Sequence, residues 1–199
     1  MIILAIDTAL DACSVAIARE GAVLASATER MERGQAERLA PMADEIMRRA
    51  GVRFSEIGRI AVTTGPGSFT GVRVGLSFAR AIALALDRPC VGVSTLEILA
   101  LGEGESGLRA AVIETQGALY VALFESGAAI MAPRAVERDE VKAVLNAAAK
   151  GRAFVCAPAG AIPDIAALAR RAAALDPALH RPEPLYLRGH GARLPSERP

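Results

Sequence analysis

The sequence predicts an α/β protein of two similar lobes, each a mixed sheet flanked by helices. Two observations lead to this prediction. Short apolar runs bounded by turn residues alternate with longer segments of helical periodicity. In the first half these segments form a three-strand meander followed by helix, strand and helix, and the same order recurs in shortened form in the second half. The repeat lies in the order of the elements rather than in the residues.

The first half begins with apolar runs separated by tight turns, a pattern typical of an antiparallel meander. A helix then presents apolar residues at helical spacing and ends before Gly51, a residue that suits a helix C-terminus. The predicted elements are strands over 2–8, 12–19 and 22–28, a helix over 35–50, a strand over 59–63, a helix over 72–86, a strand over 90–93 and a helix over 95–101.

A polar, glycine-rich connector over 102–107 predicts the boundary between the lobes. The elements expected beyond it are strands over 108–113, 118–125 and 128–131, a helix over 139–150, a strand over 153–156 and a helix over 163–175. We therefore expect an N-terminal lobe over 1–103, a shortened C-terminal lobe over 104–188 and a flexible tail over 189–199. This order of elements is what a duplicated fold of the actin/hexokinase/Hsp70 (ASKHA) type predicts.

The stretch from Thr63 to Arg73 joins a strand to a long helix through a glycine-rich turn. Such a junction places several backbone N–H groups at one spot, where an anion or a partner's backbone could dock. Its candidate residues are Gly65, Gly67, Ser68 and Thr70. The stretch matches neither the P-loop pattern nor G-x-G-x-x-G, so it does not by itself indicate a nucleotide. The alternative is a tight connection without a ligand.

The helix after this loop carries small residues at every fourth position, namely Gly71, Gly75, Ala79 and Ala83. A ridge of small side chains lets another helix or a sheet approach closely. It could pack on the chain's own sheet or meet a partner. Arg73, Arg80 and Asp87 interrupt the apolar pattern and argue against a membrane span.

The turn after the first strand contains Asp7 and Thr8, at the place where nucleotide-using proteins of this fold hold phosphate and a hydrated metal. The two side chains could equally satisfy the hairpin backbone alone. The only histidines, His180 and His190, lie ten residues apart near the C-terminus and match no zinc motif. We therefore expect no metal, no cofactor and no catalytic residues.

The formal net charge of +1 argues against strong electrostatic capture of nucleic acid by the chain alone. Three widely separated cysteines lie in apolar sequence and are expected to be buried free thiols in a reducing cytosol. The N-terminus lacks the basic region of a signal peptide, so we expect a cytoplasmic protein.

Several motifs together resemble the TsaB (YeaZ) family. They are Ile3-Leu4-Ala5-Ile6-Asp7-Thr8, Glu37-Arg38-Leu39-Ala40-Pro41, Gly65-Pro66-Gly67-Ser68-Phe69-Thr70-Gly71-Val72-Arg73-Val74-Gly75, Gly92-Val93-Ser94-Thr95-Leu96 and, near the C-terminus, Pro184-Leu185-Tyr186-Leu187-Arg188. The match covers essentially the first hundred residues. The sequence departs from the family pattern at Ala9, at Gln35-Ala36-Glu37 and at Glu114-Thr115-Gln116.

This resemblance implies a non-catalytic scaffold in bacterial tRNA threonylcarbamoyladenosine synthesis. Its partner would be the paralogous catalytic subunit TsaD, joined by the ATPase TsaE, with tRNA bound only within the complex and a homodimer possible for the isolated chain. The implied interface lies on the helices over 35–50 and 72–86, with Leu39, Met42, Ile46, Gly71, Gly75, Ala79 and Ala83 as candidates. The alternatives are an actin-fold kinase or ATPase that uses Asp7, and a glycopeptidase-like protein.

Overall fold

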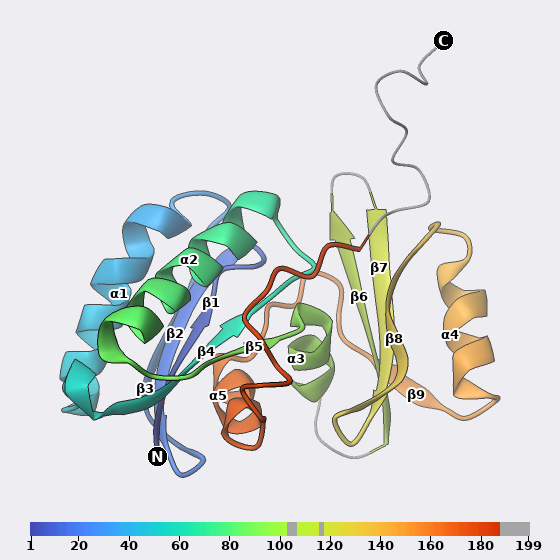
Figure 1. The fold of residues 1–199 in the computed structure, drawn as a ribbon. Coiled ribbons are helices and arrows are strands. Elements are labelled where there is room, and N and C mark those ends of the chain that lie inside the picture. Colours follow the sequence, from blue (N-terminus) through green and yellow to red (C-terminus); the bar gives the residue numbers. More distant parts are fainter. Residues whose placement is uncertain (103–106, 116–117, 188–199) are drawn as a thin grey trace.

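Two sheets, each built on an antiparallel meander, form the framework of the chain (Figure 1). The computed structural model describes residues 1–102, 107–115 and 118–187. The first sheet has the order β3-β2-β1-β4-β5. Its strands are β1 (Ile2–Asp7), β2 (Ala12–Arg19), β3 (Ala22–Arg30), β4 (Ile57–Thr63) and β5 (Cys90–Val93). The first three pair antiparallel, whereas β4 and β5 join in parallel, so the sheet is mixed.

The second sheet has the order β8-β7-β6-β9, in which β9 pairs in parallel with β6. Its strands are β6 (Leu108–Thr115), β7 (Ala118–Glu125), β8 (Ala128–Val136) and β9 (Phe154–Cys156). This order repeats β3-β2-β1-β4 of the first sheet, with the same strand directions. The duplication predicted from the order of the elements is therefore confirmed.

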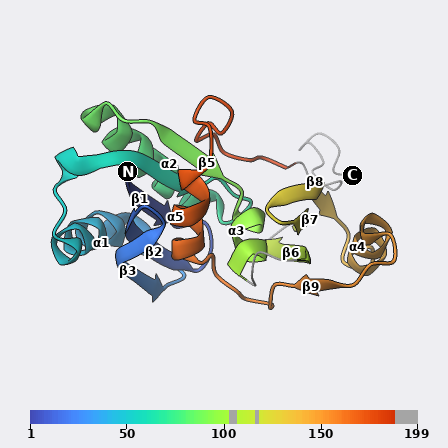
Figure 2. The same cartoon turned by 90° about the horizontal axis from the view of Figure 1, so that it is seen from below.

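Helices cover both faces of the first sheet. The helices in the described part of the chain are α1 (Gln35–Ala50), α2 (Phe69–Leu86), α3 (Thr95–Gly102), α4 (Val141–Ala149) and α5 (Ile165–Ala173), and a 3₁₀ turn, η1 (Phe54–Glu56), precedes β4. Of these, α4 packs on the second sheet. The side chains of α1 and α2 share one core with one face of the sheet, and those of α5 share another core with the opposite face. Seen from below, α5 lies beside β1 and β2, and α3 lies between the two lobes (Figure 2).

Burial on both faces explains the unbroken apolar run of β1. Leu4 and Ile6 point into the core beneath α1 and α2, whereas Ile3 and Ala5 point toward α5. A strand with only one covered face would alternate apolar and polar residues. The apolar sequence of β1 therefore fits its central position in the sheet.

The helix α5 corrects the predicted lobe boundaries. Although it comes from the second half of the chain, its residues Ile165, Leu168 and Ala172 are buried against the first sheet. Residues 104–188 are therefore not all part of the second lobe. The boundary expected after residue 103 falls on 103–106, and both this segment and the tail over 189–199 lie outside the described residues.

After α5 the chain runs back along the first sheet toward the second lobe, in a segment over 176–187 that we call the strap (Figures 1 and 2). The N–H of Gly92 in β5 donates to the carbonyl oxygen of His180 at 2.9 Å, and the N–H of Leu185 donates to that of Thr64 at 2.8 Å. A Cβ on Gly92 would lie 2.6 Å from the carbonyl oxygen of Arg181, so a glycine is required for this approach. The strap thereby covers the outer edge of β5.

The elements follow the sequence prediction closely, although several of their bounds differ and η1 was not predicted. α2 begins at Phe69 rather than at residue 72, because Ser68 caps it by accepting from the N–H of Gly71 at 3.3 Å. β8 extends to Val136 instead of 131. Of the three free thiols, Cys13 is buried and Cys90 is half-buried, but Cys156 is exposed, so the expectation that all three are buried was wrong.

Candidate functional site

The glycine-rich loop docks on the turn between β1 and β2 of its own chain. The N–H of Ser68 donates to the carbonyl oxygen of Ala9 at 2.7 Å, and the hydroxyl of Thr8 donates to that of Gly71 at 2.7 Å. A Cβ on Gly67 would lie 2.2 Å from the Ala9 oxygen, and one on Gly71 would lie 2.1 Å from the Thr8 oxygen. These two glycines therefore permit a backbone contact within the chain.

Of the two roles expected for Asp7 and Thr8, this contact favours the one in which their side chains bond to the chain's own backbone. Both are buried at the sheet end, and neither lines the cleft described below. One carboxylate oxygen of Asp7, Oδ1, accepts from the Thr63 hydroxyl at 2.5 Å and from the Ala9 N–H at 3.2 Å. Its other oxygen, Oδ2, has no hydrogen-bond partner among the described residues. The chain's own backbone and side chains thus occupy the space at this turn.

Burial raises the pKa of Asp7 from 3.8 to about 6, against the opposing effects of the Thr63 and Ala9 hydrogen bonds. The carboxyl group therefore carries a desolvation cost that no cation among the described residues relieves. Within residues 1–102, 107–115 and 118–187, no three His, Cys, Asp or Glu side chains converge in a way that could hold a metal ion.

An open cleft of about 940 Å³ lies between the lobes, next to the glycine-rich loop. Gly65, Gly67, Ser68 and Thr70 line one wall, so the structure brings the predicted loop residues to this cleft. Three aromatic side chains and four charged ones also line it. These are Phe69, Tyr120 and Tyr186, and Asp11, Glu32, Arg33 and Glu114. Glu114 is ion-paired with Arg138, so Asp11 and Glu32 line the cleft with Arg33 and leave it a small excess of negative charge.

The seven predicted interface residues lie in the core of the single chain. Leu39, Met42 and Ile46 of α1 are buried beneath the helix, and Gly71, Gly75, Ala79 and Ala83 of α2 face the sheet. The expectation that these side chains meet a partner is therefore corrected, because they are already covered by the chain's own strands. Any partner of these helices would contact their outward residues.

The last turns of α2 nevertheless present apolar residues outward, whereas Arg73, Ser77 and Arg80 are exposed on its earlier turns. Leu84 is 85% exposed, and Ala81 and Ala85 beside it are also exposed. By length and composition α2 is the one helix among the described residues that could cross a membrane, yet only 33% of its residues are buried. Core helices of soluble proteins pass the same test, and the small-residue ridge of α2 packs on the sheet. No element among the described residues covers Ala81, Leu84 and Ala85.

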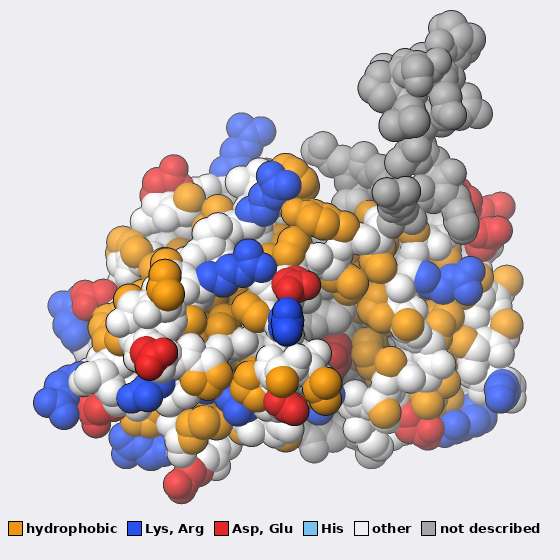
Figure 3. Space-filling model, viewed as in Figure 1, with side chains coloured by type: hydrophobic (Ala, Val, Ile, Leu, Met, Phe, Trp, Pro, Cys, Tyr) orange, Lys and Arg blue, Asp and Glu red, His pale blue; other side chains and the backbone are white. Residues whose placement is uncertain are grey.

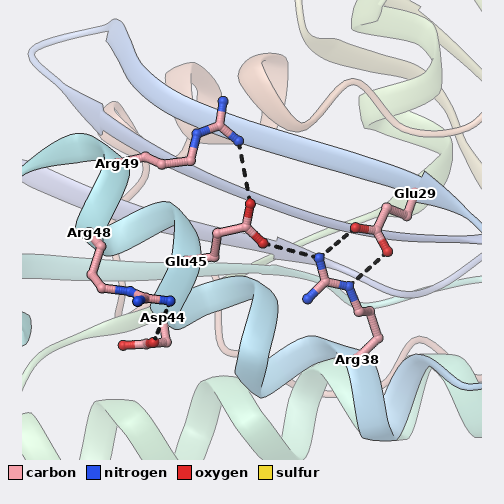
Figure 4. A network of polar contacts seen from close by, with 6 residues as sticks. All are labelled: Glu29, Arg38, Asp44, Glu45, Arg48 and Arg49. Atoms are coloured by element: carbon pink, nitrogen blue, oxygen red, sulfur yellow. Dashed lines mark hydrogen bonds and ion pairs between the residues drawn. The ribbon is translucent and has the colours of Figure 1, made fainter.

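The outward face of α1 is charged instead. Arg38 forms a bidentate pair with Glu29 of β3, at 2.7 and 2.5 Å, and a further contact with Glu45 at 3.2 Å (Figure 4). Arg49 approaches Glu45 at 3.9 Å, and Arg48 pairs with Asp44 at 3.1 Å. Such exposed pairs contribute little to stability. The two helices therefore offer a polar strip beside an apolar one.

Comparison with known proteins places this geometry in a family. The sequence profile described as "TsaD: tRNA N6-adenosine threonylcarbamoyltransferase" matches residues 23–113. The "tRNA threonylcarbamoyladenosine biosynthesis protein TsaB" of Escherichia coli is 40% identical over 129 residues, which are 63% of this chain and 55% of that protein. The protein of the same name from Bacillus subtilis is 33% identical over 127 residues, 63% of this chain and 56% of its own length.

A solved structure, YeaZ from Pseudomonas aeruginosa, superposes with a TM-score of 0.75 and 30% identity, covering 94% of this chain and 99% of that one. This chain belongs to the TsaB (YeaZ) family. The alignments with the two curated TsaB proteins span only about half of their length. The nearly complete overlap with YeaZ confirms the predicted actin-like, two-lobed fold over both lobes.

The sequence predicts the loop residues of this site but not its aromatic residues. Phe69 is part of the family motif and has no role predicted from the sequence, and Tyr186 lies more than a hundred positions from the loop. The apolar outer face of α2 was also missed, although Ala81, Leu84 and Ala85 could have been found as a second apolar stripe beside the small-residue ridge.

Proposed function

We propose that this chain is a non-catalytic subunit of bacterial tRNA threonylcarbamoyladenosine synthesis, which binds and activates a TsaD-like catalytic subunit in the cytoplasm. The observation that supports it most directly is the uncovered apolar face of α2, in a chain whose relatives carry the TsaB name. The TsaD profile also matches residues 23–113, so the first lobe resembles the presumed partner's own. Two similar lobes can pack through equivalent helices.

The outward residues of α2 are the contact surface in this proposal, in place of the seven buried positions. Leu84 is the most exposed large apolar side chain of the described residues, and Ala81 lies one turn before it. Small residues around an exposed leucine let a partner helix approach closely, and burial of the leucine then stabilises the complex by about 2 kcal/mol. The same face would pair two copies of the chain when the partner is absent.

The non-catalytic role rests on the filled β1–β2 turn. The loop occupies the phosphate position with its own backbone, through the bonds at Ala9 and Gly71. Asp7 is buried, so it is not placed to hold a hydrated metal at the cleft. A kinase or ATPase is therefore disfavoured. A TsaE-like ATPase and threonylcarbamoyl-adenylate would join only the assembled pair, and tRNA would bind stably only to that pair.

Co-expression with the TsaD-like subunit of the same organism tests the proposal. Size exclusion should show one complex for the unmodified chain, and nucleoside analysis should show modified adenosine in tRNA only when both subunits are present. Leu84→Arg should weaken association at least tenfold, because a guanidinium would be desolvated in an apolar contact. Its melting temperature should match that of the unmodified chain, since Leu84 is 85% exposed.

Leu179→Arg is the matched control, because Leu179 is also exposed, at 78%, and lies in the strap rather than on α2. This variant should still co-elute with the partner. Failure of the unmodified chain to form a complex, or equal binding by the two variants, would contradict the proposal.

A further inference from the structure

Two exposed aromatic rings and an arginine lie together at the mouth of the interlobe cleft. Phe69 is 61% exposed and Tyr186 is 60% exposed, in a chain with only five Phe and two Tyr. Their ring centroids are 6.5 Å apart with planes inclined by 35°. The guanidinium of Arg73 lies 3.6 Å from the centroid of the Phe69 ring. We call Phe69, Arg73 and Tyr186 the aromatic platform.

Hydrogen bonds from α2 and along the strap fix the position of the platform. The Nε of Arg73 donates to the hydroxyl of Tyr186 at 3.3 Å. The strap that carries Tyr186 is fixed by the Leu185 N–H bond to Thr64 and by Arg80, whose Nε donates to the carbonyl oxygen of Pro182 at 2.8 Å. Rings that are positioned before a ligand arrives lose little conformational freedom when it binds. The exposed rings are therefore suited to stacking with a planar group.

The space-filling view shows hydrophobic side chains beside arginines on the face formed by the upper part of α2 and the strap (Figure 3). The cleft beside the platform is lined by exposed side chains of both signs, Asp11, Glu32 and Arg33. The carboxylates repel phosphate but can accept hydrogen bonds from amino groups. The side chains of Arg73 and Arg33 are also exposed, so a phosphate that contacts them can stay hydrated. A neutral, flat ligand with amino groups and an external phosphate fits this distribution.

We propose that the cleft mouth binds an unpaired nucleobase of an RNA strand, stacked on the aromatic platform, with the adjacent phosphates toward Arg73 and Arg33. Proteins recognise single-stranded RNA by stacking its bases on aromatic rings and arginine planes. The proposal rests on the proposed function only in taking RNA as the macromolecule that the assembled complex acts on. It differs from a nucleotide site of the fold, since the phosphate position at the β1–β2 turn is filled.

The chain contains two tyrosines, Tyr120 and Tyr186, and both line the cleft. Incorporation of 3-fluorotyrosine therefore gives two ¹⁹F signals, which Tyr120→Phe and Tyr186→Phe assign. The probes are a single-stranded RNA hexamer and a duplex of the same sequence. The Tyr186 signal should shift on addition of the hexamer, at low salt, and respond several-fold less to the duplex. No shift of Tyr186 at saturating hexamer, or equal responses to both probes, overturns the proposal.

Affinity is measured separately by anisotropy of labelled hexamer. Phe69→Leu and Tyr186→Leu should each weaken binding by about fivefold to 150-fold, the range that corresponds to ~1–3 kcal/mol for one base stacked on an aromatic ring. Tyr186→Phe keeps the ring and should bind within about threefold of the unmodified chain. Melting curves verify that each variant is folded. Unchanged binding by both leucine variants overturns the proposal.

The TsaD-like subunit provides the last arm of the test. Tyr186→Leu should still co-elute with it, so loss of RNA binding with retained association separates this site from the partner surface. If the Tyr186 signal moves only on addition of that subunit and never with RNA, the platform is a protein contact and the proposal is wrong. If the partner fails to bind but the hexamer result holds, only the proposed function is refuted.

Discussion

The buried carboxyl group of Asp7 predicts that the protein loses stability as the pH rises from about 4 to about 6. Burial raises its pKa from 3.8 to about 6 in the folded state. Because the folded protein binds this proton more tightly than the unfolded chain, the stabilisation is complete below pH 3.8 and is lost as the pH rises through about 6. One pKa unit corresponds to about 1.4 kcal/mol, so the charged group costs on the order of 3 kcal/mol at neutral pH.

Asp7→Asn removes this titration while it keeps an oxygen that accepts from Thr63 and Ala9. Urea unfolding of both proteins from about pH 3.5 to about pH 8 gives the free energy of unfolding as a function of pH. The difference, variant minus unmodified chain, should rise by on the order of 3 kcal/mol across the window and be level above about pH 7.

Other carboxyl groups do not obscure this difference. Hydrogen bonds from arginines or backbone hold the pKa values of Glu29, Glu56 and Glu125 below their usual range, so these groups favour folding as the pH rises. Their contribution is the same in both proteins and cancels. A difference curve that stays flat between about pH 4 and about pH 7 would refute the reasoning, because Asp7 would then have the same pKa in the folded and the unfolded state.

Two further predictions concern the packing around the loop and α2. Gly67→Ala should lower the melting temperature strongly, because its Cβ would lie 2.2 Å from the Ala9 carbonyl oxygen. Gly102→Ala is the control and should leave the melting temperature unchanged, since the nearest contact of its Cβ is at 3.7 Å. Equal melting temperatures for the two variants would show that the loop can shift freely. Ala79→Leu should destabilise the isolated chain by ~1–3 kcal/mol through overpacking. The exposed neighbour Ala81→Leu should change stability by less than about 0.5 kcal/mol, and a harmless Ala79→Leu would mean that the ridge is not tightly packed.

The sequence predicted most elements of the fold because their signals are local. The continuous apolar run of β1 and the glycine after α1 each depend on a few neighbouring residues. The duplicated order of elements then limited the topology to few alternatives. The position of α5 could not be predicted in this way, since its apolar face suits either sheet and only the path of the chain decides between them.

The burial of the small residues of α2 could not be predicted for a related reason. Apolar residues occur on both sides of this helix, so periodicity does not show which side faces the sheet. Small residues at Gly71 and Gly75 suit the close approach of any neighbour, and here the neighbours are Thr8 and Val62 of the same lobe. The residues at the cleft mouth could not be predicted from the sequence, because Arg73 and Tyr186 are 113 positions apart and only the path of the strap brings them together.

One junction links the filled phosphate position, the aromatic platform and the outer face of α2. Because Gly67 has no Cβ, the loop can pack directly on the Ala9 carbonyl group, and this contact leaves no room for phosphate at the turn. The same contact fixes the first turn of α2. Phe69 therefore lies at the cleft mouth, and Arg73, one turn later, lies over the Phe69 ring. It also fixes the rotation of the helix that turns Leu84 outward. A shift of the loop in Gly67→Ala should therefore impair partner association and RNA binding together, whereas Leu84→Arg should affect only the first and Tyr186→Leu only the second.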